Sequence, residues 1–137
     1  MAVVDWRGDG WRLEDHRGRP VVLLFHRDFA CTPCKAHAID VRDRLDEFGD
    51  ALVVVVLDTR PRNLRGYRAR FVAPLDVITD ETRALHESFH FGMGADGVPV
   101  GGDVIVGRDG AVVLRYAADS PARPSVDDLV AAVRSAS

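Results

Sequence analysis

The sequence predicts an α/β fold with a central mixed β-sheet and helices on both of its faces. Three observations carry this prediction. Continuous apolar runs at residues 21–25 and 52–57 are typical of strands buried on both faces. A helical pattern lies between them, and such a β-α-β unit joins parallel strands by a right-handed crossover. A turn signal at Asp109-Gly110, between apolar residues 104–106 and 111–114, adds an antiparallel hairpin.

Shorter patterns predict the remaining elements. Residues 11–18 are expected to form a short edge strand that runs into a turn. The first helix should carry one apolar stripe and end at Gly49. The stripe consists of Cys34, Ala38, Val41, Leu45 and Phe48. After it we expect, in order, a short helix over residues 64–71, a strand over residues 75–78, a helix capped by Thr79 or Asp80, the hairpin, and a last helix that begins at Ser125.

Composition and charge indicate one soluble domain. The 137 residues suffice for a single compact unit, so we expect one domain over residues 1–137. A formal net charge of −3 gives no electrostatic reason to expect nucleic acid or an anionic membrane as partner. The first residues lack the apolar run of a secretory signal, and no stretch approaches the roughly 20 apolar residues that span a bilayer. We therefore expect a cytoplasmic protein.

The only two cysteines lie three residues apart, where the first buried strand meets the first helix, in the motif Cys31-Thr32-Pro33-Cys34. A bond between them closes almost no loop, so it has little value as a structural staple. A zinc site would need a second ligand pair, and no further cysteine exists. The motif therefore predicts a dithiol that opens and closes, with no metal or cofactor.

Their placement at a helix N-terminus predicts different roles for the two sulfurs. The positive end of the helix favours the thiolate of Cys31, which we expect to attack the oxidant. Cys34, one turn into the helix, should be more buried and should act as the resolving thiol. Pro33 suits the first turn, where its missing N–H costs nothing. Lys35 and His37 add positive charge nearby.

The predicted chemistry has two steps. Cys31 attacks a substrate disulfide, or a peroxide oxidises it to a sulfenic acid. Cys34 then displaces the partner or the hydroxyl and closes the disulfide. An external thiol donor must reopen the bond, so the expected partners are such a donor and a disulfide or peroxide substrate.

These residues resemble the thioredoxin superfamily. The segment 30–35 is similar to the thioredoxin active site W-C-G-P-C-K, with Ala and Thr in place of Trp and the first Gly. Other segments are similar to the redoxin branch, the alkyl hydroperoxide reductase and thiol-specific antioxidant group, and to its peroxiredoxin-like members with a C-x-x-C motif. They are residues 13–25, the pattern Phe25-x-Arg27-x-Phe29-x-Cys31-x-x-Cys34, residues 77–92 and residues 101–110. The resemblance implies a thioredoxin-like fold and an oxidoreductase whose electrons come from a thioredoxin-like protein or a low-molecular-weight thiol.

The chain departs from the family pattern at two places. Peroxiredoxins carry Pro-x-x-x-Thr/Ser-x-x-Cys, and counting back from Cys31 gives Asp28 and Leu24 at the Thr and Pro positions. Thioredoxins place a cis-proline beside the cysteines, before the hairpin. Gly102 occupies that position here, with Pro99 three residues upstream, and a glycine leaves the backbone free to approach a substrate. The choice between disulfide and peroxide as oxidant therefore stays open.

Other patterns suggest weaker alternatives. His86 to His90 match the zinc motif H-E-x-x-H but lack a third ligand, so we expect an exposed pair beside buried Leu85 and Phe89. Residues 92–97 match G-x-G-x-x-G but follow a helix, which indicates a loop. His26 is either a proton shuttle for Cys31 or a packed or exposed histidine without a chemical role.

Two further hypotheses remain: one replaces the enzyme function, and the other adds a binding partner to it. The first is a non-catalytic redox-sensing or metal-binding module built on the same cysteines. The second concerns a basic cluster that we expect to be a solvated helix face, with binding of an anionic thiol or a protein as the alternative. The cluster consists of Arg60, Arg62, Arg65, Arg68 and Arg70.

Overall fold

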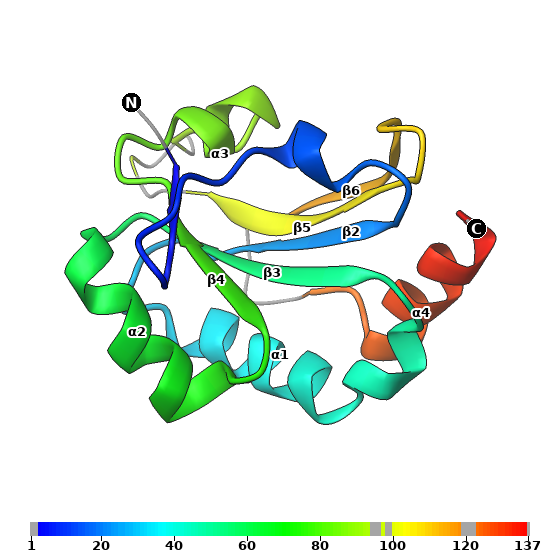
Figure 1. Ribbon diagram of the computed structural model, residues 1–137, viewed down its shortest axis with the longest axis horizontal. Helices are drawn as coiled ribbons and strands as arrows, with labels where there is room; N and C mark the ends of the chain where they lie inside the picture. Colours follow the sequence, from blue (N-terminus) through cyan, green and yellow to red (C-terminus); the bar gives the residue numbers. More distant parts are fainter. Residues whose placement is uncertain (1–2, 94–96, 98–99, 119–122, 137) are drawn as a thin grey trace.

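Six strands form one mixed sheet in the order β1-β4-β3-β2-β5-β6 in the computed structural model, which describes residues 3–93, 97, 100–118 and 123–136 (Figure 1). The strands are β1 (Val4–Asp5), β2 (Val21–Phe25), β3 (Leu52–Leu57), β4 (Asp76–Thr79), β5 (Gly101–Val106) and β6 (Val112–Ala118). β2, β3 and β4 are parallel, whereas β1, β5 and β6 run antiparallel to their neighbours. The predicted mixed sheet is therefore confirmed.

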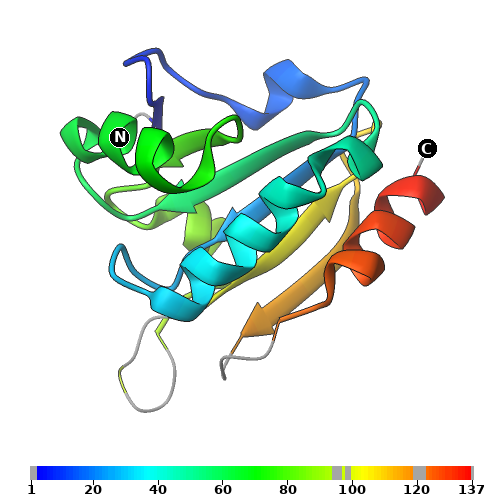
Figure 2. The same cartoon turned by 90° about the horizontal axis from the view of Figure 1, so that it is seen from below.

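Helices cover both faces of this sheet (Figures 1 and 2). The helices are α1 (Thr32–Asp43), α2 (Leu64–Tyr67), α3 (Ala84–Ser88) and α4 (Val126–Ser135). Helices α1, α2 and α4 lie on one face, and α3 lies on the other with a 3-10 turn at Leu13–His16. None of the described helices has the length and apolar character needed to cross a membrane.

The core has two layers because side chains alternate along the strands. In β2, Val22 and Leu24 face α1 and α4, whereas Leu23 and Phe25 belong to the cluster on the α3 side. All five residues of β2 are buried, as its continuous apolar run predicts. β2 ends at Phe25, beside β3 on one edge and β5 on the other, so residues 26–31 emerge at the middle of the sheet edge.

The strand expected over residues 11–18 is wrong. Leu13–His16 form a 3-10 turn, and the outer strand of the sheet on this side is β1, which pairs with β4. The apolar residues here serve packing instead of pairing. Trp11 is buried and its ring stacks on that of His16 at 5.2 Å.

The first helix is shorter than its apolar stripe. α1 ends at Asp43, and Leu45–Phe48 continue as a 3-10 turn that buries Phe48. Gly49 follows with φ of 62°, the left-handed conformation in which a C-terminal glycine is favoured, as expected. The last helix begins as predicted, because the Ser125 hydroxyl accepts the N–H of Asp128 at 3.1 Å.

Candidate active site

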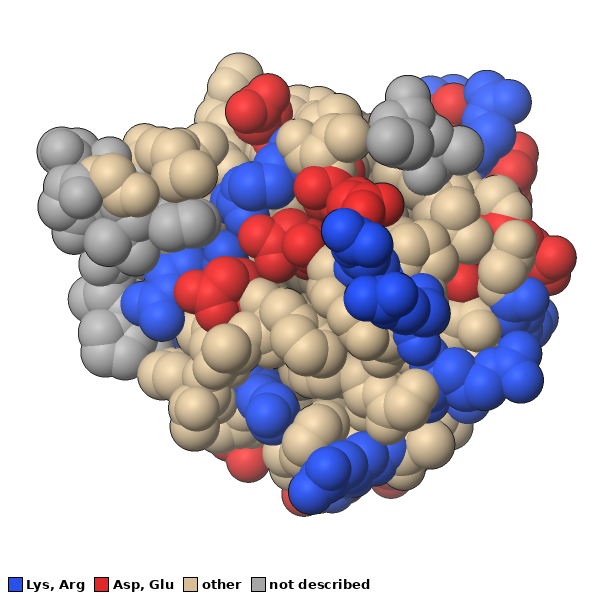
Figure 3. All heavy atoms as spheres, turned by 90° about the vertical axis from the view of Figure 1, so that its left-hand side faces the viewer, with Lys and Arg blue, Asp and Glu red and all other residues tan. Residues whose placement is uncertain are grey.

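The two cysteines lie at the end of β2 and the start of α1, and a disulfide joins them. Cys31 is the N-cap residue of α1, and its sulfur accepts the N–H of Cys34 at 3.3 Å. Pro33 occupies the first turn, where no intrahelical N–H is needed. Figure 3 faces the edge of the sheet at which β2 and β3 end, where Lys and Arg side chains alternate with carboxylates.

The expected difference in burial between the sulfurs is wrong. Cys31 and Cys34 are each 4% exposed. Residue 34 is buried because it lies on the inner face of α1, and Cys31 is buried because the helix cap folds it against the same turn. Burial therefore does not separate an attacking from a resolving thiol.

The hydrogen-bond donors do separate the two sulfurs. Cys34 Sγ accepts the backbone N–H of Arg27 at 3.4 Å and the guanidinium of Arg123 at 3.2 Å. For Cys31 Sγ, the one donor found among the described residues is the N–H of Cys34. A guanidinium beside a sulfur stabilises its thiolate, so the electrostatics favour negative charge on Cys34.

Arg123 reaches this position from the segment that follows β6, and a buried carboxylate holds it there. Its guanidinium donates to Asp103 Oδ1 at 2.6 Å and to the carbonyl oxygen of Phe25 at 3.0 Å. Asp103 is fully buried on β5, and its other oxygen is 2.7 Å from His37 Nε2 on α1. A buried ion pair with satisfied partners is the arrangement in which such charges are tolerated inside a protein.

Asp103 and Arg123 were not predicted as site residues. Asp103 breaks an apolar strand, which is a local signal for a buried functional carboxylate, but nothing near Arg123 in the sequence ties it to residues 31–34. Chain folding alone brings these segments together, across 89 positions from Cys34 to Arg123.

Thr32, Lys35 and Arg27, the remaining candidates around the cysteine pair, lie near the disulfide and differ in their surroundings. Thr32 is exposed at the first helical position. The Lys35 amine lies 4.0 Å from the ring centre of Phe71, so its charge sits over an aromatic face. Arg27 contributes its backbone N–H to Cys34, while its own side chain lies beside Asp28.

Gly102 serves the packing of β5. It pairs with Phe25 on one side and Ala117 on the other. A Cβ at this position would clash with the carbonyl oxygen of Tyr116 and would lie 2.8 Å from the ring of Phe91. The glycine is thus required by its neighbours inside the sheet. Pro99, upstream of it, lies outside the described residues.

His26 belongs to the core, the packed alternative for this residue. Its Nε2 is 2.7 Å from the hydroxyl of Tyr67, and the ring is 1% exposed. Burial is the main cause, followed by electrostatic interactions with Arg123, His37 and His86, and together they lower the pKa of His26 from 6.5 to about 3. The ring is therefore neutral at physiological pH.

The exposed histidine pair is also a wrong expectation. His86 is fully buried, with Nδ1 2.7 Å from Asp80 and Nε2 3.0 Å from the carbonyl oxygen of His26, whereas Leu85 and Phe89 are only partly buried. Burial acts to raise the pKa of Asp80, but hydrogen bonds from the His86 ring and from two backbone N–H groups outweigh it and lower that pKa. His90 is exposed, and no group of three or more metal-ligating side chains forms among the described residues.

The remaining motifs stay outside the site. The predicted loop of residues 92–97 lies partly outside the described residues. In the basic cluster, Arg68 binds the carbonyl oxygens of Leu75 and Pro74, and the other four arginines are exposed.

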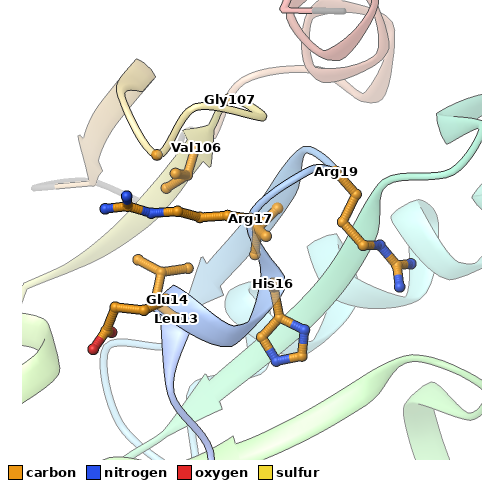
Figure 4. A pocket seen from close by; sticks show the side chains of 9 residues that line it. Leu13, Glu14, His16, Arg17, Arg19, Val106 and Gly107 are labelled. Carbon is orange, nitrogen blue, oxygen red and sulfur yellow. The ribbon is translucent and has the colours of Figure 1, made fainter.

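A separate cavity of about 240 Å³ lies at the opposite end of β2 (Figure 4). The 3-10 turn and the start of β2 form one side of it, and the end of β5 with the following turn forms the other. Its lining includes Leu13, Glu14, His16, Arg17, Arg19, Val106 and Gly107. It contains neither cysteine, so the redox-capable groups lie elsewhere.

Comparison with known proteins agrees with this fold. The chain is 27% identical over 123 residues to the protein named "Putative peroxiredoxin MT2597" of Mycobacterium tuberculosis, which covers 83% of this chain and 78% of that protein. A cysteine-to-serine variant of peroxiredoxin Q from Xanthomonas campestris superposes with a TM-score of 0.85 at 19% identity, over 100% of this chain and 92% of the other. The structure of MTB dsbF, in mixed oxidised and reduced forms, gives 0.75 at 17% identity, over 100% and 95%. The family model of the AhpC/TSA family matches residues 1–115, and the chain therefore belongs to the AhpC/TSA family.

Proposed function

We propose that this protein is a thiol-dependent oxidoreductase that cycles the Cys31–Cys34 disulfide, with Cys34 as the sulfur that attacks the oxidant. One observation carries the proposal: Cys34 Sγ accepts a backbone N–H and the guanidinium of a buried arginine. Donors of this kind favour the thiolate, which is the nucleophile in peroxide reduction and in disulfide exchange.

The family motif supports this order of attack when it is counted from the second cysteine. Counting Pro-x-x-x-Thr/Ser-x-x-Cys back from Cys34 puts Cys31 at the hydroxyl position and Arg27 at the proline position. A thiol then stands where the motif has its hydroxyl. Cys31, one helical turn away, is therefore placed to resolve the sulfenic acid or mixed disulfide that forms on Cys34.

The cycle balances with either class of oxidant. The Cys34 thiolate attacks a peroxide ROOH to give a sulfenic acid, and the departing RO⁻ takes a proton to become ROH. The Cys31 thiol attacks that sulfur, so that the disulfide closes and water leaves. With a disulfide RSSR, Cys34 forms a mixed disulfide and releases one RSH, and Cys31 releases the second. An external thiol donor supplies two electrons and two protons to reopen the bond.

A peroxide is the favoured oxidant because the family and its peroxiredoxin Q-like fold point that way. The likeness to dsbF and the C-x-x-C spacing favour a disulfide substrate as the second candidate. The same proposal includes a single domain and a cytoplasmic location, with a thioredoxin-like protein or a low-molecular-weight thiol as donor.

Single-cysteine variants test this function. Reduced wild-type protein would receive one equivalent of hydrogen peroxide or glutathione disulfide, followed by alkylation at set times and intact-mass measurement. We expect the wild type to lose two hydrogens. Cys31→Ser should react and keep one oxygen or one glutathione on Cys34, and Cys34→Ser should react at least about tenfold more slowly.

Two results would contradict the proposal at different levels. Faster reaction of Cys34→Ser than of Cys31→Ser would restore the attack by Cys31 that the helix N-terminus predicts. Failure of both oxidants to close the disulfide would rule out the oxidoreductase and favour a non-catalytic binding or metal-binding module. The ratio of the peroxide rate to the disulfide rate decides between the two substrate classes.

A further inference from the structure

His37 is joined to the disulfide by an unbroken series of contacts. Its Nε2 lies 2.7 Å from Asp103 Oδ2, Asp103 Oδ1 lies 2.6 Å from Arg123, and Arg123 lies 3.2 Å from Cys34 Sγ. His37 and Cys34 are also three residues apart on α1, which puts both on the same buried face of the helix. The His37 side chain is 10% exposed, so it keeps contact with solvent.

The charge of this buried cluster changes when the disulfide opens. With the bond closed, the guanidinium of Arg123 is balanced by the carboxylate of Asp103, and Cys34 is neutral. With the bond open and Cys34 as thiolate, one cation faces two anions. An uncompensated charge is costly in a buried site, and the group able to add a positive charge near neutral pH is an imidazole.

We propose that His37 takes up the compensating proton when the disulfide is reduced and releases it when the disulfide closes. Two electrons and two protons from the thiol donor then give the Cys31 thiol, the Cys34 thiolate and the His37 imidazolium. On oxidation the steps are reversed: Cys34 and Cys31 close the disulfide, and the His37 proton passes to the departing alkoxide or thiolate. The proposal rests on the proposed function in two respects: the Cys31–Cys34 bond opens, and Cys34 carries the thiolate in the reduced protein.

The charged and titratable neighbours of His37 within the described part of the chain fit this role. Asp103 of β5 accepts from the imidazole, and Arg123 lies behind that carboxylate. His26, after β2, interacts with the charges of His37 and Arg123 but has a pKa lowered to about 3, so it stays neutral. On α1 itself, Cys34 precedes His37 by one turn and exposed Asp40 follows it by one turn. Cys34 is the member of this set whose charge follows the redox state.

If proton binding at His37 is linked to the redox state of the disulfide, the proton affinity of His37 must differ between the two states, and this difference can be measured without any substrate. Titration of the histidine rings by NMR, with the His37 signals assigned from a His37→Gln variant, compares the oxidised protein with protein reduced by dithiothreitol. We expect the His37 midpoint to lie at least about one pH unit higher in the reduced protein, a tenfold gain in proton affinity. Exposed His90 provides the internal control and should titrate alike in both states.

The single-cysteine variants separate the two sulfurs in the same experiment. Cys31→Ser keeps the Cys34 thiolate and should show the high midpoint of the reduced protein. Cys34→Ser lacks that charge and should show the midpoint of the oxidised protein. Equal midpoints in the two variants, or in the two redox states of the wild type, would overturn the proposal.

The equilibrium with dithiothreitol provides a second readout. Dithiothreitol releases two protons on oxidation, so a protein that takes up two protons gives an exchange constant that does not vary with pH. Without His37, the protein takes up one proton while Cys34 stays ionised, and the constant should rise about tenfold per pH unit. A flat profile in His37→Gln would contradict the role of His37. This test needs only chemical opening of the disulfide, so it succeeds or fails independently of turnover.

Discussion

Arg123 places its guanidinium 3.2 Å from the sulfur of Cys34, across 89 positions of sequence. The same guanidinium binds the end of β2 at Phe25 and the carboxylate of Asp103 on β5. One side chain therefore ties the C-terminal segment to both strands that border the disulfide. The chemistry proposed for Cys34 depends on this contact, and so does the position of the segment that leads into α4.

Loss of the Arg123 charge should weaken the Cys34 thiolate. In an Arg123→Met variant we expect the thiolate titration midpoint, followed by absorbance near 240 nm in a Cys31→Ser background, to rise by at least about one pH unit. The rate of reaction with hydrogen peroxide at neutral pH should fall by about tenfold or more. Arg123→Lys, which keeps the charge but not the fork of donors, should recover part of the rate.

Folding needs its own control because Arg123→Met leaves the buried Asp103 carboxylate without its cation. A double variant with Asp103→Asn removes both charges and should restore much of the lost stability. An Arg62→Met variant removes an exposed arginine from the basic cluster and should change neither readout. An unchanged thiolate midpoint in both Arg123 variants would show that the guanidinium does not tune Cys34.

Gly102→Ala should destabilise the protein by about 2 kcal/mol or more, because the new methyl group meets the Tyr116 carbonyl oxygen and the Phe91 ring within a packed sheet. Gly66→Ala is the matched control. Beyond its chain neighbours and the backbone of its own helix, no atom lies within 4 Å of its Cβ position in α2, so alanine should be neutral or stabilising by up to about 1 kcal/mol. Urea denaturation of both variants measures the difference, and equal midpoints would contradict the packing role.

Acid should destabilise the fold through His26. Its pKa falls from 6.5 to about 3 on folding, because burial disfavours the imidazolium. Between those two values the unfolded chain binds a proton that the native state excludes. The neutral His26 should therefore make its full contribution to the free energy of unfolding above pH 6.5. As the pH drops towards 3, that free energy should fall by up to about 1.4 kcal/mol per pH unit. Denaturation at several pH values measures that slope.

A His26→Gln variant, which places an amide opposite the Tyr67 hydroxyl in place of the imidazole, should lack this component of the slope. His90→Gln, at an exposed position, should keep it. Identical slopes in the wild type and His26→Gln would mean that other groups govern the acid sensitivity.

Removal of the α4 cap should cost about 1 kcal/mol in a Ser125→Ala variant, because the Asp128 N–H loses its acceptor at the start of the helix. Ser135→Ala, at the other end of α4, removes a hydroxyl that donates to the Ala131 carbonyl oxygen and should cost less than about 0.5 kcal/mol. Thermal denaturation distinguishes the two variants. A larger loss at Ser135 would contradict the capping argument.

Elements specified by local patterns were predictable from the sequence. β2 and β3 follow from continuous apolar runs, the β5–β6 hairpin from Asp109-Gly110, and the start of α4 from Ser125. The Leu13–His16 segment was not, because a short amphipathic stretch near a buried tryptophan suits an edge strand or a 3-10 turn equally well. Only the position of β1 against β4 decides between them, and that pairing is not local.

The site residues show the same difference between local features, which the sequence reveals, and non-local contacts, which it does not. Cys31 and Cys34 are visible in the sequence because their spacing and their strand-to-helix position are local features. His37 lies on α1, Asp103 on β5 and Arg123 in the segment between β6 and α4, so their contacts depend on how the sheet closes against α1. The order of attack proposed here differs from the sequence-based expectation for this reason: the helix N-terminus favours Cys31, whereas the cation beside Cys34 arrives from a distant part of the chain.

The neighbours Gly102 and Asp103 also protect the sheet against mispairing. Gly102 lies on the side of β5 that holds Phe91, and Asp103 lies on the side that faces α1. Sliding β5 by one position against β2 would exchange these sides and bury a carboxylate among aromatic rings, while removing the anion from Arg123. Gly102 and Asp103 therefore favour a single alignment of the strands. The Asp103 carboxylate, which orients Arg123 beside the disulfide, also disfavours an incorrectly paired sheet.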